Sequence, residues 1–197
     1  MERNQARDLT TRDTVLLIAA ALGGTADGRT VVQKLAYFVG LALSASLGHR
    51  PHYYGPYSSR VEDALNLAVV AGELDEQVQR FPDWYGGPDV RRYTYRLTDD
   101  GRNKVDALKG AHPDEWQRIQ EAVAAIKRVV PDLEQKTLSS AAKTYLIVSE
   151  SEETVSEDEI PDLARHLGWT LNKAQVRKTV EILEELGLLE VEQAGTS

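Results

Sequence analysis

The two histidines His49 and His52 are spaced as H-x-x-H and are the side chains best suited to bind a metal ion. A zinc site in a protein takes three or four protein ligands, drawn from cysteine, histidine and carboxylates. The chain has no cysteine, and no ordered set of carboxylates accompanies the two histidines. We therefore expect both to be solvent-exposed loop residues, with no metal or other cofactor bound.

Acidic side chains are concentrated in residues 150–162, which hold seven acids and no base. This run lacks the spacing of aspartate, asparagine and glycine that a calcium-binding loop requires. We expect a solvated loop followed by the start of a helix. The chain also has no G-x-S-x-G, no Walker loop and no dinucleotide fingerprint. We therefore expect a noncatalytic protein, and an enzyme is the weakest hypothesis.

Four arginines lie on two segments, residues 73–81 and 90–97, whose alternating pattern predicts a β-hairpin. A basic hairpin can follow the phosphate backbone of DNA or enter its minor groove. The alternative is a solvated strand pair in which acidic side chains balance the arginines, namely Asp75, Glu76, Asp83 and Asp89. The candidate DNA contacts on this hairpin are Arg80, Arg91, Arg92 and Arg96.

A second polar and basic group stands in the first half of a helix that we expect near the C-terminus. Asparagine and glutamine can read base edges, whereas lysine and arginine contact phosphates. The alternative is a helix with surface ion pairs, because Glu181, Glu184 and Glu185 follow in its second half. The candidate DNA contacts on this helix are Asn172, Lys173, Gln175, Arg177 and Lys178.

A third group combines polar and aromatic side chains from a helix and from the turn that follows it. Such a surface can hold a protein partner or a phosphate. The alternative is structural, because tyrosine rings commonly pack over a helix with one hydroxyl satisfied, while Gln33 and Lys34 hold the loop GPYS in place. The candidate partner-binding residues are Arg29, Gln33, Lys34, Tyr37, Tyr54 and Tyr57.

The elements that carry these side chains follow the order of a winged-helix domain over residues 1–110. Helical spacing predicts helices over residues 14–23 and 30–47, with the loop TADGR between them. A third helix is expected to begin at a capping box of Ser59 and Glu62. The hairpin follows, and then a helix with Thr98 as its N-cap.

Residues 111–197 are expected to form a helical region that ends in a helix-turn-helix unit. Helices over residues 115–130 and 138–149 carry apolar stripes, on which we expect a homodimer to form. A helix that ends at Gly168 is followed by a short turn and by a helix whose capping box is Asn172 and Gln175. The segment LLEVE after that helix is expected to be a strand.

Two motifs in residues 29–75 resemble those of known families. The helix motif R-T-x-x-Q-K-x-x-Y, followed by the turn Y-Y-G-P-Y-S, resembles the uncharacterised bacterial and archaeal winged-helix proteins of the YwgA type. A looser similarity, through K-L-x-Y and Y-G-P, is to the SocA-like (Panacea) group of antitoxins and proteolytic adaptors. The resemblance implies a winged-helix fold, and it implies no particular chemistry.

Composition favours a globular protein with a buried core, since 42% of residues are hydrophobic and 27% are charged. The net charge of −8 arises in residues 132–197, which carry 6 basic and 14 acidic residues, whereas residues 1–131 carry 17 of each. An acidic chain is not typical of a nonspecific nucleic-acid binder, although only the docking face must be basic. The third helix is a poor DNA reader, because Arg60 stands beside Glu62 and Asp63.

The longest apolar runs, residues 15–22 and 36–43, are much shorter than the roughly 20 residues of a membrane span. The first residues lack the apolar core of a signal peptide. We therefore expect a soluble cytoplasmic protein without a membrane partner. Its expected function is that of a noncatalytic winged-helix regulator that contacts double-stranded DNA as a homodimer. The alternative is a protein-binding adaptor or antitoxin-like module that does not bind DNA.

Overall fold

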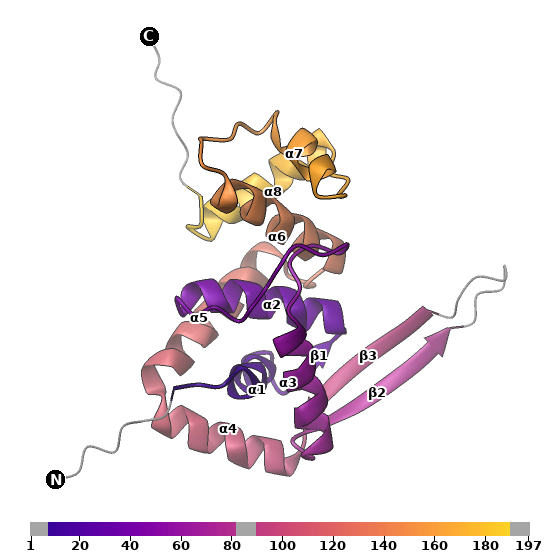
Figure 1. Cartoon of the computed structure of the whole chain (residues 1–197). Coiled ribbons are helices and arrows are strands. Elements are labelled where there is room, and N and C mark those ends of the chain that lie inside the picture. The colour runs from indigo at the N-terminus through magenta and orange to yellow at the C-terminus, as the bar shows by residue number, and fades with distance from the viewer. Residues whose placement is uncertain (1–7, 82–89, 190–197) are drawn as a thin grey trace. The chain divides into compact units, whose positions relative to one another are not determined.

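The structure is a computed structural model that describes residues 8–81 and 90–189. Over these residues the chain is mainly helical, with eight helices and a small three-stranded antiparallel sheet (Figure 1). The chain divides into two compact units, the first comprising Met1–His49 and Ser58–Ala124 and the second Arg50–Tyr57 and Ala125–Ser197. These bounds differ from the expected domains, 1–110 and 111–197, and whether those domains fold independently stays a prediction.

The first helix, α1 (Thr11–Ala21), begins at a capping box formed by Thr10 and Asp13. The Asp13 amide donates to Thr10 Oγ1 at 3.1 Å, and the Thr10 amide donates to Asp13 Oδ2 at 3.1 Å. The apolar pattern predicts a start at residue 14, which is late because the first turn of this helix is polar. Cap chemistry, which satisfies backbone amides that have no partner in the helix, sets the true boundary.

The strand β1 (Thr25–Asp27) lies where the sequence predicts a loop, so that prediction is wrong. Its three residues pair antiparallel with Arg96, Tyr95 and Thr94 of β3. A strand this short shows no alternation of its own, and its partner stands far along the chain. The next helix, α2 (Arg29–Ala42), ends before the predicted residue 47, because the backbone turns at Ser44 with a φ of 54°.

After α3 (Ser59–Val70), the strands β2 (Leu74–Phe81) and β3 (Val90–Leu97) form the predicted hairpin. The sheet order is β1-β3-β2, with both pairs antiparallel. The helix α4 (Asp99–Ala111) follows directly, and its predicted N-cap is confirmed because the Gly101 amide donates to Thr98 Oγ1 at 3.0 Å. The cap of α3 is Ser58, not the predicted Ser59, since the Val61 amide donates to the Ser58 hydroxyl.

The core of the first unit is built around α1. In Figure 1 this helix is seen along its axis, with α2, α3 and α4 around it. Leu16, Leu17 and Ile18 of α1 have no exposed surface. Each such side chain stabilises the fold by about 1.5–3 kcal/mol relative to an exposed position.

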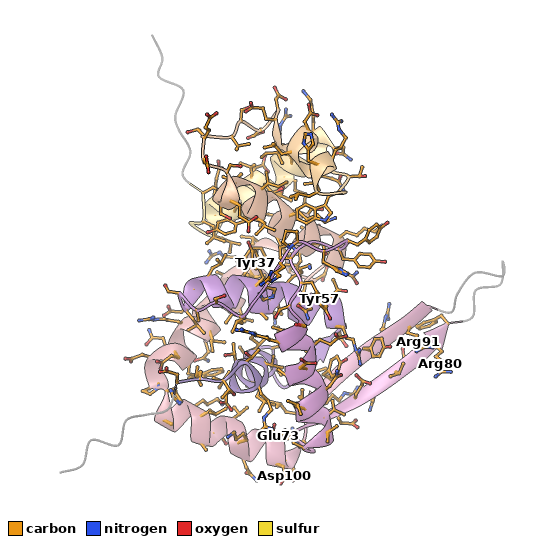
Figure 2. The ribbon with its side chains drawn as sticks, viewed as in Figure 1. Tyr37, Tyr57, Glu73, Arg80, Arg91 and Asp100 are labelled. Carbon is orange, nitrogen blue, oxygen red and sulfur yellow. The ribbon has the colours of Figure 1, made fainter. Side chains whose placement is uncertain are left out.

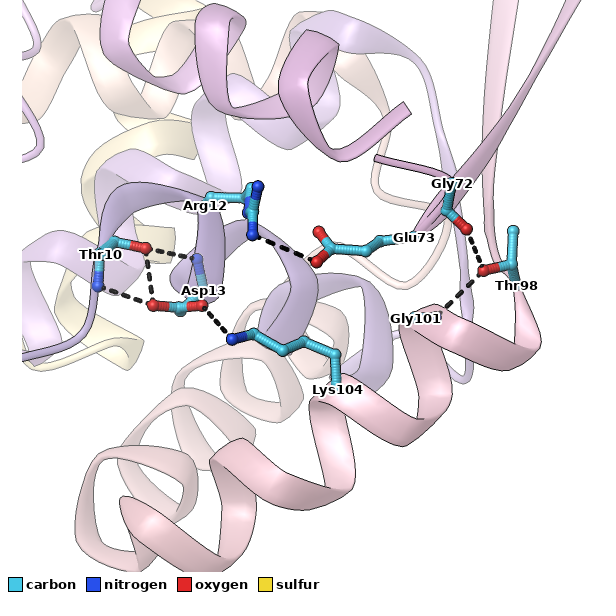
Figure 3. Close-up of polar contacts among 8 residues, drawn as sticks. All are labelled: Thr10, Arg12, Asp13, Gly72, Glu73, Thr98, Gly101 and Lys104. Atoms are coloured by element: carbon cyan, nitrogen blue, oxygen red, sulfur yellow. Dashed lines mark hydrogen bonds and ion pairs between the residues drawn. The ribbon is translucent and has the colours of Figure 1, made fainter. Parts of the chain in front are cut away.

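Polar side chains tie α1 to its neighbours, as Figure 3 shows. Arg12 Nη2 lies 3.3 Å from Glu73 Oε1, at the turn before β2, and Lys104 Nζ of α4 lies 3.7 Å from Asp13 Oδ1. The Thr98 hydroxyl donates to the Gly72 carbonyl at 2.5 Å. These contacts fix the turn between α3 and β2, from which the hairpin extends.

The second unit contains the later helices, α6 (Gln135–Glu150), α7 (Ile160–His166) and α8 (Lys173–Glu185). The helix α6 packs on α7 and α8, and the hydroxyls of Thr144 and Thr179 form a buried hydrogen bond of 2.9 Å between α6 and α8. After α8, Leu188 and Leu189 form a bend, so the predicted strand does not begin there. The rest of that predicted strand, residues 190–192, lies outside the described residues.

The helix α5 (Pro113–Val129) contributes residues to both units. Its apolar stripe and that of α6 are buried in the single chain, including Ile119, Val123 and Ile126 of α5 and Leu138 of α6. These stripes therefore do not supply the apolar dimer surface that we expected on them. Among the residues that the structure describes, no helix is long and apolar enough to cross a membrane.

Candidate functional site

The four hairpin arginines are exposed, but they do not share one face. Arg80 of β2 stands directly opposite Arg91 of β3, whereas Arg92 and Arg96 stand opposite Gln79 and Asp75. Directly opposite residues of an antiparallel pair project from the same face. Arg80 and Arg91 therefore share one face, near the far end of the hairpin (Figure 2), and Arg92 and Arg96 lie on the other.

The pairing of Arg80 with Arg91 places like charges next to each other. Such a pair weakens a strand ladder, by an amount comparable to the roughly 0.2–1 kcal/mol that a favourable pair contributes. Among the described residues, neither arginine has an acid within ion-pair distance. Of the acids expected to balance them, Asp83 and Asp89 lie outside the described residues. The end of the hairpin thus presents adjacent guanidinium groups to solvent.

Glu76, another of the acids expected to balance the hairpin, is engaged by Arg29 instead. Arg29 Nη2 donates to Glu76 Oε2 at 2.9 Å, and Arg29 Nε donates to the Tyr95 hydroxyl at 2.7 Å. The Tyr95 hydroxyl in turn donates to Glu76 Oε2 at 2.6 Å. The guanidinium also lies 4.3 Å from the centre of the Tyr93 ring and 3.8 Å from Glu62.

This network shifts the ionisation of Arg29, Glu76 and Tyr95. Burial alone would raise the pKa of the Glu76 carboxyl, but the hydrogen bonds from Tyr95 and Arg29 hold it below its ordinary value. Burial, together with the hydrogen bond to Glu76, raises the pKa of Tyr95. Burial would lower the pKa of Arg29, yet its bonds to Glu76 and Tyr95 raise it. Arg29, a candidate partner-binding residue, therefore anchors the start of α2 to the sheet.

Gln33 holds the start of α3. Its Nε2 donates to the Ser58 carbonyl at 2.9 Å, and its Oε1 accepts from the Ser58 amide at 2.9 Å. The Ser58 hydroxyl donates to the Leu47 carbonyl at 2.5 Å. Gln33 is buried, as are Lys34 and Tyr37, so these three candidates do not form an exposed surface. The contacts of Gln33 are those of the structural alternative, in which it holds the loop.

His49 is half-buried, so the prediction of a solvent-exposed loop residue is wrong. Its ring packs edge-on against Tyr37 at 5.3 Å between centroids, and its Nε2 lies 3.1 Å from the Gln33 carbonyl. Burial lowers the pKa of His49 to about 4, and the ring is therefore neutral at pH 7. His52 is exposed as expected. No group of three or more metal-binding side chains occurs within residues 8–81 and 90–189.

Residues 50–57 form a closed loop in the second unit. Arg50 and Tyr57 exchange backbone hydrogen bonds, and the buried Trp169 donates its Nε1–H to the His52 carbonyl at 2.7 Å. At the tip, the rings of Tyr53 and Tyr54 meet edge-on at 4.8 Å and are 71% and 58% exposed. Tyr54 is thus exposed, whereas the ring of the candidate Tyr57 is half-buried against His52.

The outward side of α3 confirms that this helix carries little positive charge. Its exposed residues include Arg60, Asp63, Leu67 and Val70, and the last two are 55% and 86% exposed. The Arg60 side chain lies along the backbone of Gly48, as the close approach of the two shows. A Cβ added at Gly48 would stand 3.2 Å from Arg60 Cδ. Helical spacing distinguishes this apolar end, since Leu67 and Val70 lie off the face that the buried residues of the helix share.

The start of α8 is closed by the predicted capping box, which is confirmed. The Gln175 amide donates to Asn172 Oδ1 at 2.9 Å, and the Asn172 amide donates to Gln175 Oε1 at 3.0 Å. Reading of adenine by these residues uses the same side-chain oxygen as an acceptor. Base readout by Asn172 or Gln175 would therefore compete with the cap.

The basic residues of α8 are exposed, and one has an acidic partner nearby. Lys173 Nζ lies 2.6 Å from Asp158 Oδ1. This hydrogen bond holds the pKa of Asp158 below its usual value, and the charges of Lys173 and Arg177 act in the same direction. Arg177 and Lys178 are exposed further along the helix. An exposed ion pair is weak, so it leaves Lys173 able to exchange Asp158 for a phosphate.

No protein-family model matches the chain, and no curated protein sequence matches it. The resemblance to proteins of the YwgA type and to the SocA-like group therefore stays a prediction.

Proposed function

We propose that the first unit is a winged helix and that the protein is a noncatalytic regulator that binds double-stranded DNA. The element order α1-β1-α2-α3-β2-β3, with β1 paired to β3, supports the winged-helix proposal. In this arrangement α3 occupies the place of a recognition helix and the β2–β3 hairpin that of the wing. The charge on α3 is unsuitable for a phosphate backbone, so the hairpin makes the principal contact.

The observation that carries the proposal is the pairing of Arg80 with Arg91. Two guanidinium groups across one rung of a strand pair repel each other, and a phosphate between them replaces that repulsion with two charge-assisted contacts. Arg92 and Arg96, on the other face, reach a neighbouring stretch of backbone. Contacts of this kind fix position without reading sequence.

The second unit supplies further phosphate contacts through Lys173, Arg177 and Lys178. Asn172 and Gln175 read bases where hydrogen bonds to base edges are more favourable than the hydrogen bonds of the capping box that they replace. Because one unit of this type covers a short site, the regulator acts as a homodimer on two half-sites.

The test is a titration of labelled mixed-sequence duplex DNA, followed by fluorescence anisotropy at low and moderate salt. The double variant Arg80→Gln/Arg91→Gln should bind about tenfold more weakly, and the slope of log K against log salt should fall by about two. The matched control is Arg118→Gln/Arg128→Gln, which removes the same charge from exposed positions of α5 and should bind like the native chain. If the native chain retains no DNA at low salt, DNA binding is excluded.

A protein-binding adaptor is the second candidate, and the exposed pair Tyr53–Tyr54 favours it. Tyrosine is enriched among the residues that dominate protein–protein binding energy, and these two rings form one exposed aromatic pair. The exposed Leu67 and Val70 of α3 add apolar surface in the first unit. Absence of DNA binding in the titration above would favour this candidate.

A further inference from the structure

The second unit contains a hollow of about 650 Å³ between α8 and residues 151–159, which precede α7. We call residues 151–159 the acidic segment. The apolar lining of the hollow comes from α6, from the acidic segment, from the start of α7, from α8 and from the residues after α8. Ile160 is almost fully buried, whereas Val155 and Leu188 keep part of their surface exposed. The apolar lining residues are Val148, Val155, Ile160, Val180, Leu188 and Leu189.

The rim of the hollow is acidic. It carries Glu153, Glu157, Glu159 and Glu184, and no basic residue lines it among the residues that the structure describes. The Ser156 hydroxyl and amide donate to Glu159 Oε2 at 2.6 and 2.9 Å, which holds the pKa of Glu159 below its usual value. Glu159 is therefore ionised at neutral pH, and the rim is negatively charged.

A second hollow of about 520 Å³ continues along the same segment. It shares Glu153, Thr154, Val155 and Glu159 with the first and adds further acids, Glu152 and Asp162. We call the two hollows together the acidic groove; they are lined by residues 151–157, 159–160 and 162–163 with Val148, Val180, Glu184, Leu188 and Leu189. The ion pair of Asp158 with Lys173 ties the acidic segment to α8.

We propose that the acidic groove binds a basic peptide segment of a protein partner, with apolar side chains in the hollows and lysine or arginine at the rim. The charge of the rim is complementary to such a segment and repels nucleic acid. The apolar floor binds the side chains that lie between the basic ones, because their burial removes apolar surface from water on both sides. Two adjoining hollows suit an extended or helical segment better than one side chain. This binding is independent of the DNA contact proposed for the hairpin.

The probe is a short fluorescein-labelled synthetic peptide of leucine and lysine, compared with peptides of equal length made of leucine and glutamine or of leucine and glutamate. The full chain should bind the lysine peptide at least about tenfold more tightly than the glutamine peptide, and salt should weaken the difference. The glutamate peptide should show no binding. Equal binding of the lysine and glutamine peptides would overturn the proposal.

Two matched double variants distinguish binding in the acidic groove from attraction of the peptide by the overall negative charge. Glu157→Gln/Glu184→Gln removes two rim charges and should weaken lysine-peptide binding about tenfold. Glu181→Gln/Glu185→Gln removes two exposed charges of α8 that do not line either hollow, and should bind like the native chain. Equal losses in the two variants would show that net charge attracts the peptide and would overturn the proposal.

A second readout does not depend on charge. In ¹H–¹³C methyl spectra of the full chain, the lysine peptide should shift the resonances of Val155, Val180 and Leu188. The methyl groups of the first unit, such as Leu67 and Val70 on the exposed side of α3, should stay unchanged. Shifts confined to the first unit would contradict binding in the acidic groove.

Discussion

At the scale of the residue, His49 makes the stability of the first unit depend on pH. Its folded pKa of about 4 lies below its ordinary 6.5, mainly because of burial and in part because of the Lys34 charge. The unfolded chain therefore takes up the proton first, so the stabilisation is complete above about pH 6.5 and is lost as pH falls towards 4. Between about pH 7 and pH 5 this linkage should remove at most about 2 kcal/mol from the free energy of unfolding.

The measurement is urea unfolding of the native chain and of His49→Gln at both pH values. A glutamine amide can donate to the Gln33 carbonyl but does not titrate, so the variant should lose most of the dependence on pH. His166→Gln changes an exposed histidine and serves as the control. Its free energy of unfolding should depend on pH as that of the native chain does. If His49→Gln keeps the same loss between the two pH values, another group is responsible.

Residues whose roles are local could be predicted from the sequence, and residues whose roles depend on distant partners could not. The caps at Thr98 and Asn172 follow from side chains within three positions of each other. The burial of His49 depends on Tyr37 and Gln33, which approach it through the turn after α2. The same holds for Glu76, which the alternation of β2 presents as a surface acid although it binds Arg29.

At the scale of the element, Gly101 lets α4 begin directly against the turn after α3. A Cβ at this position would stand 2.0 Å from the Glu73 carbonyl oxygen, which already accepts the Thr98 amide at 3.1 Å. Because the clashing oxygen belongs to the backbone, the clash can be relieved only if α4 moves away from the turn. We expect Gly101→Ala to lower the free energy of unfolding by about 3 kcal/mol or more.

The control for this change lies on the same helix. At Gly110 of α4 an added Cβ would meet nothing within 4 Å, and the φ of this residue is not in the left-handed region. Gly110→Ala should therefore stabilise the chain by about 0.5–1 kcal/mol, because alanine loses less entropy in a helix. Thermal and urea unfolding of both variants give the comparison. A Gly101→Ala chain as stable as the native one would contradict the close approach of α4 to the turn.

Long periodic elements could be predicted, whereas boundaries and short elements could not. The hairpin and the helices of the second half follow from spacing alone, because each has several turns or rungs. The strand β1 and the early end of α2 depend on pairing with β3 and on the backbone turn at Ser44. Neither leaves a pattern in the residues themselves.

At the scale of the whole molecule, acidic charge is concentrated in one segment. Residues 150–162 hold seven acids and no base, and the exposed pair of Asp158 with Lys173 joins them to α8. The sequence predicts this imbalance, but it does not predict that residues 50–57 join the second unit. That membership depends on the hydrogen bond from Trp169 to the His52 carbonyl, between residues 117 positions apart.

The concentration of charge predicts that salt stabilises the two units unequally. Like charges in residues 150–162 repel one another at low ionic strength, and 0.1 M salt largely screens the repulsion between exposed charges that are more than about 10 Å apart. In the first unit the ion pairs of Arg12 with Glu73 and of Lys104 with Asp13 hold carboxylates that are 11% and 13% exposed, and salt screens such partly buried pairs much less. Hydrogen exchange followed by mass spectrometry resolves the two units. With added salt, exchange in α7 should slow several-fold while exchange in α4 stays unchanged or quickens.

The variant Glu157→Gln/Glu184→Gln should respond less in α7, and equal slowing of α4 and α7 would show that the acidic segment is not the cause.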